Sequence, residues 1–244
     1  MATIAVYSLK GGVGKTTLAI NLAWASATRS ARRTLLWDLD PQAASTFLLG
    51  GDTGTRHPAQ AIFSKDVAAA KLIRATAIDR LALLPADTSL RTLDQLFHAL
   101  DKKKRLSRLL EDLAEDFDRI LLDCPPGLTE TSEQVMRAAD LIVVPVAPSP
   151  LSQRAFAEVA AHLAQRGAKV PLMPVHAMVD RRRKLHAEAL AQHPDWPVIP
   201  MASIVESVAV RRAPVGAFAP RSAGTRAFND LWQAIEHALA GRAG

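Results

Sequence analysis

A glycine-rich segment near the start of the chain constrains the fold more than any other feature. It lies between an apolar run and a segment of helical periodicity, and it reads Ser8-Leu9-Lys10-Gly11-Gly12-Val13-Gly14-Lys15-Thr16-Thr17. The core Gly-x-x-Gly-Lys-Thr is the second half of a phosphate-binding P-loop. Glycines there let backbone N–H groups close around phosphate oxygens, and the following helix turns its positive end to the same place. The segment therefore predicts a nucleotide site in a strand–loop–helix unit.

Three side chains of this loop have predicted roles. Lys15 is expected to reach the β- and γ-phosphate oxygens, and the Thr16 hydroxyl to ligate Mg²⁺. The usual pattern has a further glycine five residues before Gly14, but this chain has Leu9 there, followed by Lys10. Lys10 therefore places a second cation beside the phosphate loop, which is the kind of charge that an arginine finger supplies.

Acidic residues stand where two later strands are predicted to end. Asp38 and Asp40 close the apolar run 35–39, and a strand period of two puts both side chains on one side. Asp123 ends the run 119–123 and suits a Walker B acid, which holds Mg²⁺ through water. Cys124, beside it, is interpreted as a small buried filler. Three strand-end acids converging on a P-loop favour a metal–nucleotide site over simple turn caps.

Short apolar runs alternate with longer segments of helical period along the whole chain. The predicted strands are 3–8, 33–39, 81–85, 118–123, 140–147, 170–178 and 196–201. The predicted helices are 15–29, 88–98, 101–115, 130–138, 151–166, 182–192 and 222–240. This alternation predicts an α/β fold with one doubly wound, mostly parallel sheet and helices on both faces. We expect residues 1–244 to form a single P-loop ATPase domain, with 48–60 as a mobile loop and the ligand at the carboxyl ends of the strands.

Composition limits the cellular location and the kinds of partner that are expected. The single cysteine among 244 residues excludes an intrachain disulfide, and no signal peptide or membrane-length apolar run is found, so we expect a cytoplasmic protein. The net charge of +6 is uneven, because residues 151–244 hold 12 Lys/Arg against 7 Asp/Glu. Such an excess indicates an acidic partner such as DNA or an anionic membrane, or else only a solvated surface.

Taken together, these motifs resemble the ParA/MinD family of P-loop ATPases. The resemblance rests on Lys-Gly-Gly-Val-Gly-Lys-Thr-Thr at 10–17, Asp-Leu-Asp-Pro-Gln at 38–42 and Asp-Cys-Pro-Pro at 123–126. It implies ATP and Mg²⁺ as cofactors and a homodimer that forms on ATP binding. In such a dimer Lys10 acts in trans, Asp40 positions the attacking water, Asp38 supports the Mg²⁺ shell and Asp123 is the Walker B acid.

The resemblance also suggests residues on the base side of the nucleotide. The segment Met178-Val179-Asp180-Arg181-Arg182 is similar to the family's Asp-x-Arg region, so adenine contacts are expected from 178–182 and 200–204. The complete predicted nucleotide set is Lys10, Gly11, Gly12, Val13, Gly14, Lys15, Thr16, Thr17, Met178 and Asp180.

Two basic groups are candidates for DNA binding. ParA proteins that bind DNA without sequence preference carry basic residues near these places, although Ala209 stands where the aligned arginine is usual. The predicted DNA-binding residues are Arg181, Arg182, Arg183, Lys184, Arg211 and Arg212. The alternative is a solvated charged face.

Several functions share such a loop. We predict a nucleoid-associated, ParA-like ATPase that positions a plasmid, chromosome region or protein cluster, with a ParB-like or cargo-adaptor protein stimulating hydrolysis. A MinD-like membrane ATPase and a metabolic P-loop ligase are the alternatives.

No membrane partner is expected, because the apolar stripe of helix 222–240 is more typical of core packing. One cysteine excludes a four-cysteine cluster in a dimer, and a single tyrosine argues against a tyrosine kinase.

Overall fold

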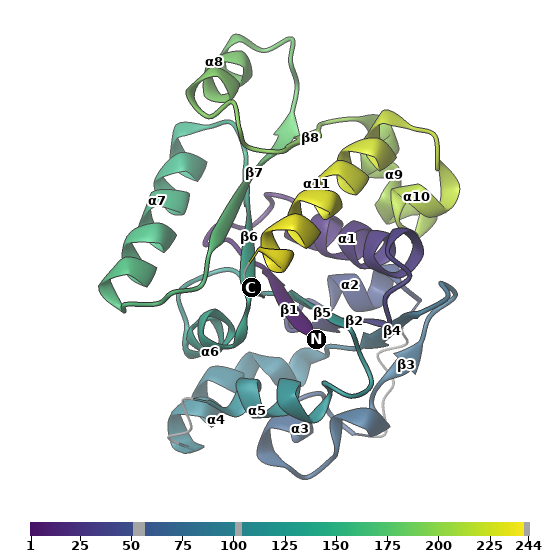
Figure 1. Cartoon of the computed structure of the whole chain (residues 1–244). Helices are drawn as coiled ribbons and strands as arrows, with labels where there is room; N and C mark the ends of the chain where they lie inside the picture. The colour runs from purple at the N-terminus through teal and green to yellow at the C-terminus, as the bar shows by residue number, and fades with distance from the viewer. Residues whose placement is uncertain (51–56, 101–103, 242–244) are drawn as a thin grey trace.

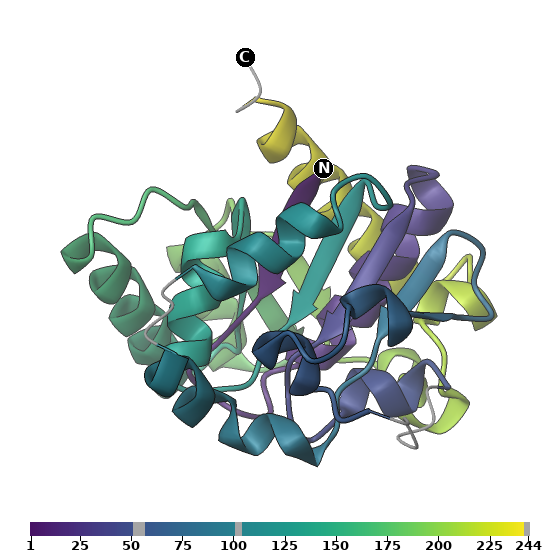
Figure 2. The same cartoon turned by 90° about the horizontal axis from the view of Figure 1, so that it is seen from below.

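The computed structural model describes residues 1–50, 57–100 and 104–241, and a mostly parallel sheet runs through its centre. The strands are β1 (Ala2–Val6), β2 (Thr34–Asp38), β3 (Arg74–Ala75), β4 (Leu81–Leu84), β5 (Arg119–Asp123), β6 (Leu141–Val146), β7 (Leu172–Val179) and β8 (Val198–Pro200). Their order in the sheet is β3-β4-β2-β5-β1-β6-β7-β8. Among the strand pairs of the described residues, only β3–β4 is antiparallel. Figure 2 shows β1, β5 and β2 running side by side in the same direction.

Helices cover both faces of this sheet. They are α1 (Lys15–Arg29), α2 (Ala44–Leu48), α3 (Ala61–Ser64), α4 (Leu93–Leu100), α5 (Arg105–Asp112), α6 (Glu130–Ala138), α7 (Pro150–Gln165), α8 (Lys184–Gln192), α9 (Ser203–Arg211), α10 (Val215–Phe218) and α11 (Ala223–Ala240), with 3-10 turns η1 (Ala69–Lys71) and η2 (Thr88–Thr92). Figure 1 shows α1 and α11 on one side of the strands and α4 to α7 on the other. The doubly wound α/β prediction is therefore confirmed.

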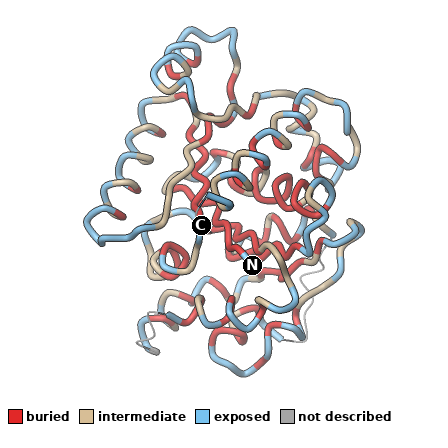
Figure 3. Tube along the Cα trace, in the orientation of Figure 1, coloured by how far each residue is buried: buried red, intermediate tan, exposed pale blue. Residues whose placement is uncertain are grey.

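Burial explains why the central strands are apolar at successive positions. Every residue of β1, β2 and β6 is buried, and Figure 3 shows the central strands as the most buried part of the trace. A strand covered on both faces has no solvent side, so it does not alternate. The apolar stripe of α11 packs into the core through Phe228, Leu231, Trp232 and Ile235, as predicted.

Each predicted strand is present, with ends that differ by one or two residues. Several elements were not predicted: the two-residue edge strand β3 and the helices α2, α3, α9 and α10. Four of these five are too short to carry a periodic signal, and α9 is rich in β-branched residues that have low helix propensity.

Three helix predictions need correction. The helix expected at 101–115 is confined to α5, with residues 101–103 outside the described part. The helix at 88–98 begins as the 3-10 turn η2, where the Asp87 side chain accepts from Ser89 N. Residues 181–183 form the turn before α8 rather than its first residues. Residues 51–56 of the predicted loop 48–60 lie outside the described residues.

Candidate nucleotide site

The phosphate loop joins β1 to α1 and has open space in front of its glycines. Gly12 and Gly14 have φ of +71° and +89°, which only glycine adopts readily. A Cβ built on Gly11, Gly12 or Gly14 would meet no atom within 4 Å. Lys15, the first residue of α1, is 7% exposed, and its Nζ donates to the Lys10 carbonyl at 3.3 Å. The loop is thus a backbone cradle with one buried cation at its base.

A cavity of about 760 Å³ opens in front of this loop at the carboxyl ends of the strands. Lys15 and Asp40 line it, as do Met178 and Met201. The full lining comprises Gly11, Gly12, Val13, Gly14, Lys15, Thr16, Thr17, Leu18, Asp40, Pro41, Gln42, Pro125, Pro126, Ala177, Met178, Ile199, Pro200, Met201, Ala202, Val205, Glu206 and Phe228. The cavity therefore joins the P-loop to both segments from which adenine contacts were expected.

The part of the cavity expected to hold the adenine base differs in detail from the predicted set of contacts. Met178 lines the cavity, but Asp180 does not. Asp180 instead accepts Arg182 Nε and Nη2 at 2.9 Å each, and this pairing lowers the pKa of its carboxyl to about 2. Glu206 of α9 also lines the cavity with a carboxylate. It was not predicted as a site residue, because α9 itself was not predicted.

Asp123 is the carboxylate best suited to a cation. It is 1% exposed, and its Oδ2 accepts from Ser45 Oγ at 2.6 Å. Its buried Oδ1 has no hydrogen-bond partner among the described residues. Burial raises the pKa of this carboxyl, against the lowering effect of the Ser45 and Thr16 hydroxyls. An unsatisfied buried carboxylate oxygen beside the Thr16 hydroxyl fits Mg²⁺.

Asp38 lies beside Asp123 at the end of the neighbouring strand and is fully buried. Its Oδ2 accepts from Thr46 N and Oγ1 at 2.9 and 2.8 Å, and its Oδ1 accepts from Asp40 N at 3.1 Å. Burial, and then the charge of Asp123, raise the pKa of Asp38. With both oxygens engaged, Asp38 is placed to orient its neighbours rather than to ligate a cation directly.

Asp40 stands at the cavity wall, where a water could reach it. Its Oδ1 accepts from Gln42 N at 2.9 Å, and it is partly exposed. In the described part of the chain, no group of three His, Cys, Asp or Glu side chains is placed to hold a metal alone. A Mg²⁺ ion here would therefore depend on Asp123, Thr16, water and nucleotide oxygens together, which is common for this ion.

Cys124 is fully buried. Its Sγ lies 3.6 Å from the Leu122 carbonyl, and burial raises the pKa of its thiol. A protonated, enclosed thiol does not act as a nucleophile. The interpretation of Cys124 as a core filler is confirmed.

The two predicted basic groups lie apart. Arg181 to Arg183 form the turn before α8 and Lys184 begins that helix. Arg211 ends α9 and Arg212 caps it. The helices α8 and α9 are well separated in Figure 1. Arg182 is paired with Asp180. Arg212 donates to the Phe47 carbonyl, and the Arg211 guanidinium lies 6.0 Å from the Phe218 ring centroid. The structure therefore offers two separate basic patches rather than one.

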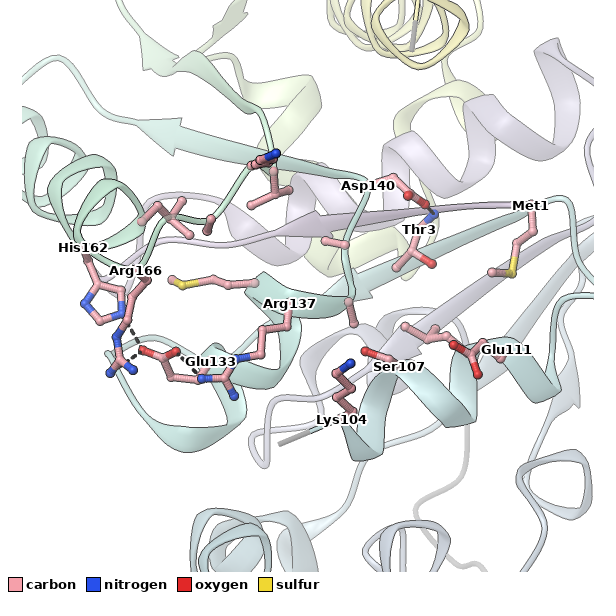
Figure 4. Close-up of a pocket in the computed structure, with 18 residues that line it drawn as sticks. Met1, Thr3, Lys104, Ser107, Glu111, Glu133, Arg137, Asp140, His162 and Arg166 are labelled. Atoms are coloured by element: carbon pink, nitrogen blue, oxygen red, sulfur yellow. Dashed lines mark hydrogen bonds and ion pairs between the residues drawn. The ribbon is translucent and has the colours of Figure 1, made fainter. Parts of the chain in front are cut away.

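A second cavity, of about 860 Å³, lies at the opposite ends of the strands. Figure 4 shows Glu133 of α6 facing Arg137 of the same helix, His162 of α7 and Arg166, which follows α7 directly. Glu133 forms ion pairs with Arg137 at 3.2 Å and Arg166 at 3.4 Å and also contacts His162. None of the predicted site residues lines this cavity.

Known proteins resemble this chain over most of its length. The family model described as an AAA domain matches residues 1–166. Sporulation initiation inhibitor protein Soj of Bacillus subtilis is 28% identical over 242 residues, covering 93% of this chain and 95% of that protein. Among the described residues, no helix has the length and apolar character needed to cross a bilayer.

Solved structures show the same fold. The Cyanothece McdA–ATP complex superposes with a TM-score of 0.82 at 21% identity, covering 98% of this chain and 96% of that one. Cobyrinic acid a,c-diamide synthase of Mycobacterium smegmatis, bound to an ATP analogue and magnesium, gives 0.81 at 26% identity, covering 96% and 94%. The chain belongs to the ParA/MinD family of P-loop ATPases.

Proposed function

We propose that this chain is a ParA-type positioning ATPase that forms an ATP-sandwiched homodimer. The observation that carries the proposal is the different placement of the two loop lysines. Lys15 lines the nucleotide cavity, whereas Lys10 does not. The Lys10 ammonium has no ion pair or hydrogen bond within the described residues, so it is available to a second nucleotide. A cation supplied in trans neutralises charge on the transferring phosphate.

Within each subunit the other roles follow from the contacts. Asp123 and Thr16 hold Mg²⁺, which offsets negative charge on the β- and γ-phosphates. Lys15 binds the same phosphates from the base of the cradle. Asp40 orients the attacking water through the carboxylate oxygen that Gln42 N leaves free. Asp38 fixes the backbone of Asp40 by accepting its N–H.

The partners are non-specific DNA and a ParB-like or cargo-adaptor protein that stimulates hydrolysis, giving a nucleoid-associated ATPase. Phosphate contacts would come from Arg181, Arg183 and Lys184 on one patch and from Arg211 and Arg212 on the other. Arg182 contributes less, because Asp180 neutralises it. The similarity to Soj over nearly the whole chain supports this assignment.

The apolar face of α11 gives no support to the lipid alternative. Phe228, Leu231 and Trp232 are each at most 1% exposed and pack into the core. A helix that binds a membrane surface would need to present such a face to solvent. The similarity to the cobyrinic acid synthase favours a metabolic ATP-dependent reaction as the second candidate function. DNA binding distinguishes the positioning ATPase from this alternative.

Binding to random-sequence duplex DNA, measured at two salt concentrations with ATP or ADP, tests the proposal. We expect tight, salt-sensitive binding with ATP and weak binding with ADP. The log–log salt slope should be about −0.9 for each phosphate neutralised. DNA binding that is absent in both nucleotide states would contradict the proposal and favour the metabolic alternative.

A further inference from the structure

Helix α2 contacts both the carboxylates of the nucleotide site and the basic end of α9. It has five residues, and three in succession reach outside the helix. Ser45 Oγ donates to Asp123, Thr46 donates to Asp38, and the Phe47 carbonyl accepts from Arg212. One short helix therefore joins the predicted cation site to a predicted DNA-binding residue that is 165 positions away in sequence.

The contact between Arg212 and Phe47 has two parts. Arg212 Nε and Nη2 donate to the Phe47 carbonyl at 3.1 and 2.9 Å. Its guanidinium carbon lies 4.3 Å from the Phe47 ring centroid, within the range of a cation–π interaction. A planar guanidinium makes both contacts at once, which a lysine does not. The direction of the Arg212 head group is thus set by the position of Phe47.

The start of α2 is held to the nucleotide site by hydrogen bonds. Ser45 and Thr46 are both fully buried, and Thr46 Oγ1 also accepts from Ala86 N at 2.9 Å. The chain leading into α2 is held by Ala43 N, which donates to the Asp40 carbonyl at 2.8 Å. A change in the backbone at Asp40, or in the carboxylate of Asp123, therefore reaches α2 directly.

We infer that α2 transmits the state of the nucleotide site to Arg212. When a cation and nucleotide engage Asp123, the Ser45 hydrogen bond and the start of α2 adjust with it. The Phe47 ring, which stacks on the Arg212 guanidinium, carries that adjustment to the guanidinium, and so to the affinity of α9 for a polyanion. Coupling of this kind requires that the contacts differ between the two nucleotide states. The DNA part rests on the proposed function; the movement of α9 requires only nucleotide binding.

Phe47→Ala tests the link without removing a charge. Phe47 is 55% exposed, so its substitution should leave folding and nucleotide affinity unchanged. In the wild type, ATP should strengthen DNA binding over ADP by at least about 5-fold, the lower end of typical allosteric coupling. In Phe47→Ala this ratio should fall to within about 2-fold of unity, with the salt slope unchanged. Arg212→Ala should instead reduce the slope by about 0.9.

Two further variants control this measurement. Val210→Ala changes an 85% exposed neighbour on α9 and should keep the wild-type ratio. Phe47→Leu keeps an apolar side chain but removes the aromatic ring that stacks on Arg212, so it should also lose most of the ratio. A full ATP-to-ADP ratio in Phe47→Ala would overturn the inference.

Hydrogen exchange without DNA separates the inference from the proposed function. On Mg²⁺–ATP binding, wild-type amides at 44–49 and at 208–212 should both change protection relative to ADP. In Phe47→Ala the change at 44–49 should persist and the change at 208–212 should disappear. A wild type that shows no change at 208–212, or a variant that retains it, would refute the relay even if DNA binds. Absent DNA binding with an intact exchange pattern would refute only the DNA-binding function.

Discussion

The two large cavities lie at opposite ends of the parallel strands and have similar volumes, about 760 Å³ at the phosphate loop and about 860 Å³ at the other end. The carboxylates near the two cavities differ in how they are paired. Close to the phosphate loop, although not in the cavity lining, Asp123 Oδ1 is buried and has no hydrogen-bond partner among the described residues, and the loop glycines face open space. At the other end, Glu133 is surrounded by Arg137, His162 and Arg166 (Figure 4).

Cavity volume therefore does not identify the site. A buried carboxylate oxygen without a partner costs free energy that a bound cation recovers, whereas a carboxylate already paired with arginines has little to gain from a ligand. The larger cavity is better explained as a place where ion pairs hold α6 against α7.

Lys15→Ala should abolish nucleotide binding. The ammonium is buried at the base of the cradle, and truncating one partner of a buried charge pair costs about 2–5 kcal/mol. ATP affinity measured by calorimetry should fall by about 30-fold or more. Lys169→Ala, a lysine lining the opposite cavity, is the matched control and should bind ATP normally. Wild-type affinity in Lys15→Ala would contradict the assignment of the loop.

Asp40→Ala should bind ATP and remain a dimer but hydrolyse it slowly. Asp40 lies at the cavity wall, and a group that positions or activates water contributes about 100-fold or more to the rate. Single-turnover hydrolysis should therefore fall by that factor while ATP affinity stays the same. Asp79→Ala, an exposed aspartate at the far edge of the sheet, controls for loss of a charge. Unchanged hydrolysis would remove Asp40 from the mechanism.

Lys10→Ala should bind nucleotide but lose the ATP-dependent dimer. Lys10 does not line the cavity of its own chain, so the affinity of the monomer for ATP should be preserved. A charged hydrogen bond across the interface contributes about 1.5–3 kcal/mol, so dimerisation should weaken by about 10- to 100-fold. Analytical ultracentrifugation with ATP measures the dimerisation. Lys71→Ala controls for the loss of a lysine charge elsewhere in the chain. An intact dimer would refute the trans role.

The sequence predicted the parts of the site that are encoded locally. The phosphate loop, the strand-end acids Asp38, Asp40 and Asp123, and the parallel sheet that brings them together all follow from short motifs and from apolar runs. Lys15 and Asp40 do line one cavity, because the loops that follow β1 and β2 lie at the same edge of the parallel sheet. The buried state of Cys124 could also be anticipated, because it extends an apolar strand.

The parts that were missed depend on contacts between distant segments. Helix α2 is five residues long, and its role comes from hydrogen bonds of Ser45 and Thr46 to other strands rather than from a pattern of its own. Asp180 was predicted to contact the nucleotide, and its pairing with Arg182 was not anticipated from the sequence. The position of Arg212 against Phe47 has no local signature, since their sequence separation is 165 residues.

The smallest predicted effect is at the opposite cavity. Glu133 has a side chain 13% exposed, and Glu133→Gln removes the charge that Arg137 and Arg166 share. Leaving partly buried donors less well satisfied should lower the free energy of unfolding by about 1–2 kcal/mol, measured by urea denaturation. Glu111→Gln, an exposed carboxylate lining the same cavity, should change it by less than about 0.5 kcal/mol. ATP affinity and hydrolysis should match the wild type in both, because no contact of Glu133 reaches the phosphate loop. A stable Glu133→Gln protein with slowed hydrolysis would contradict the assignment of different roles to the two cavities. It would indicate that the larger cavity takes part in ATP hydrolysis.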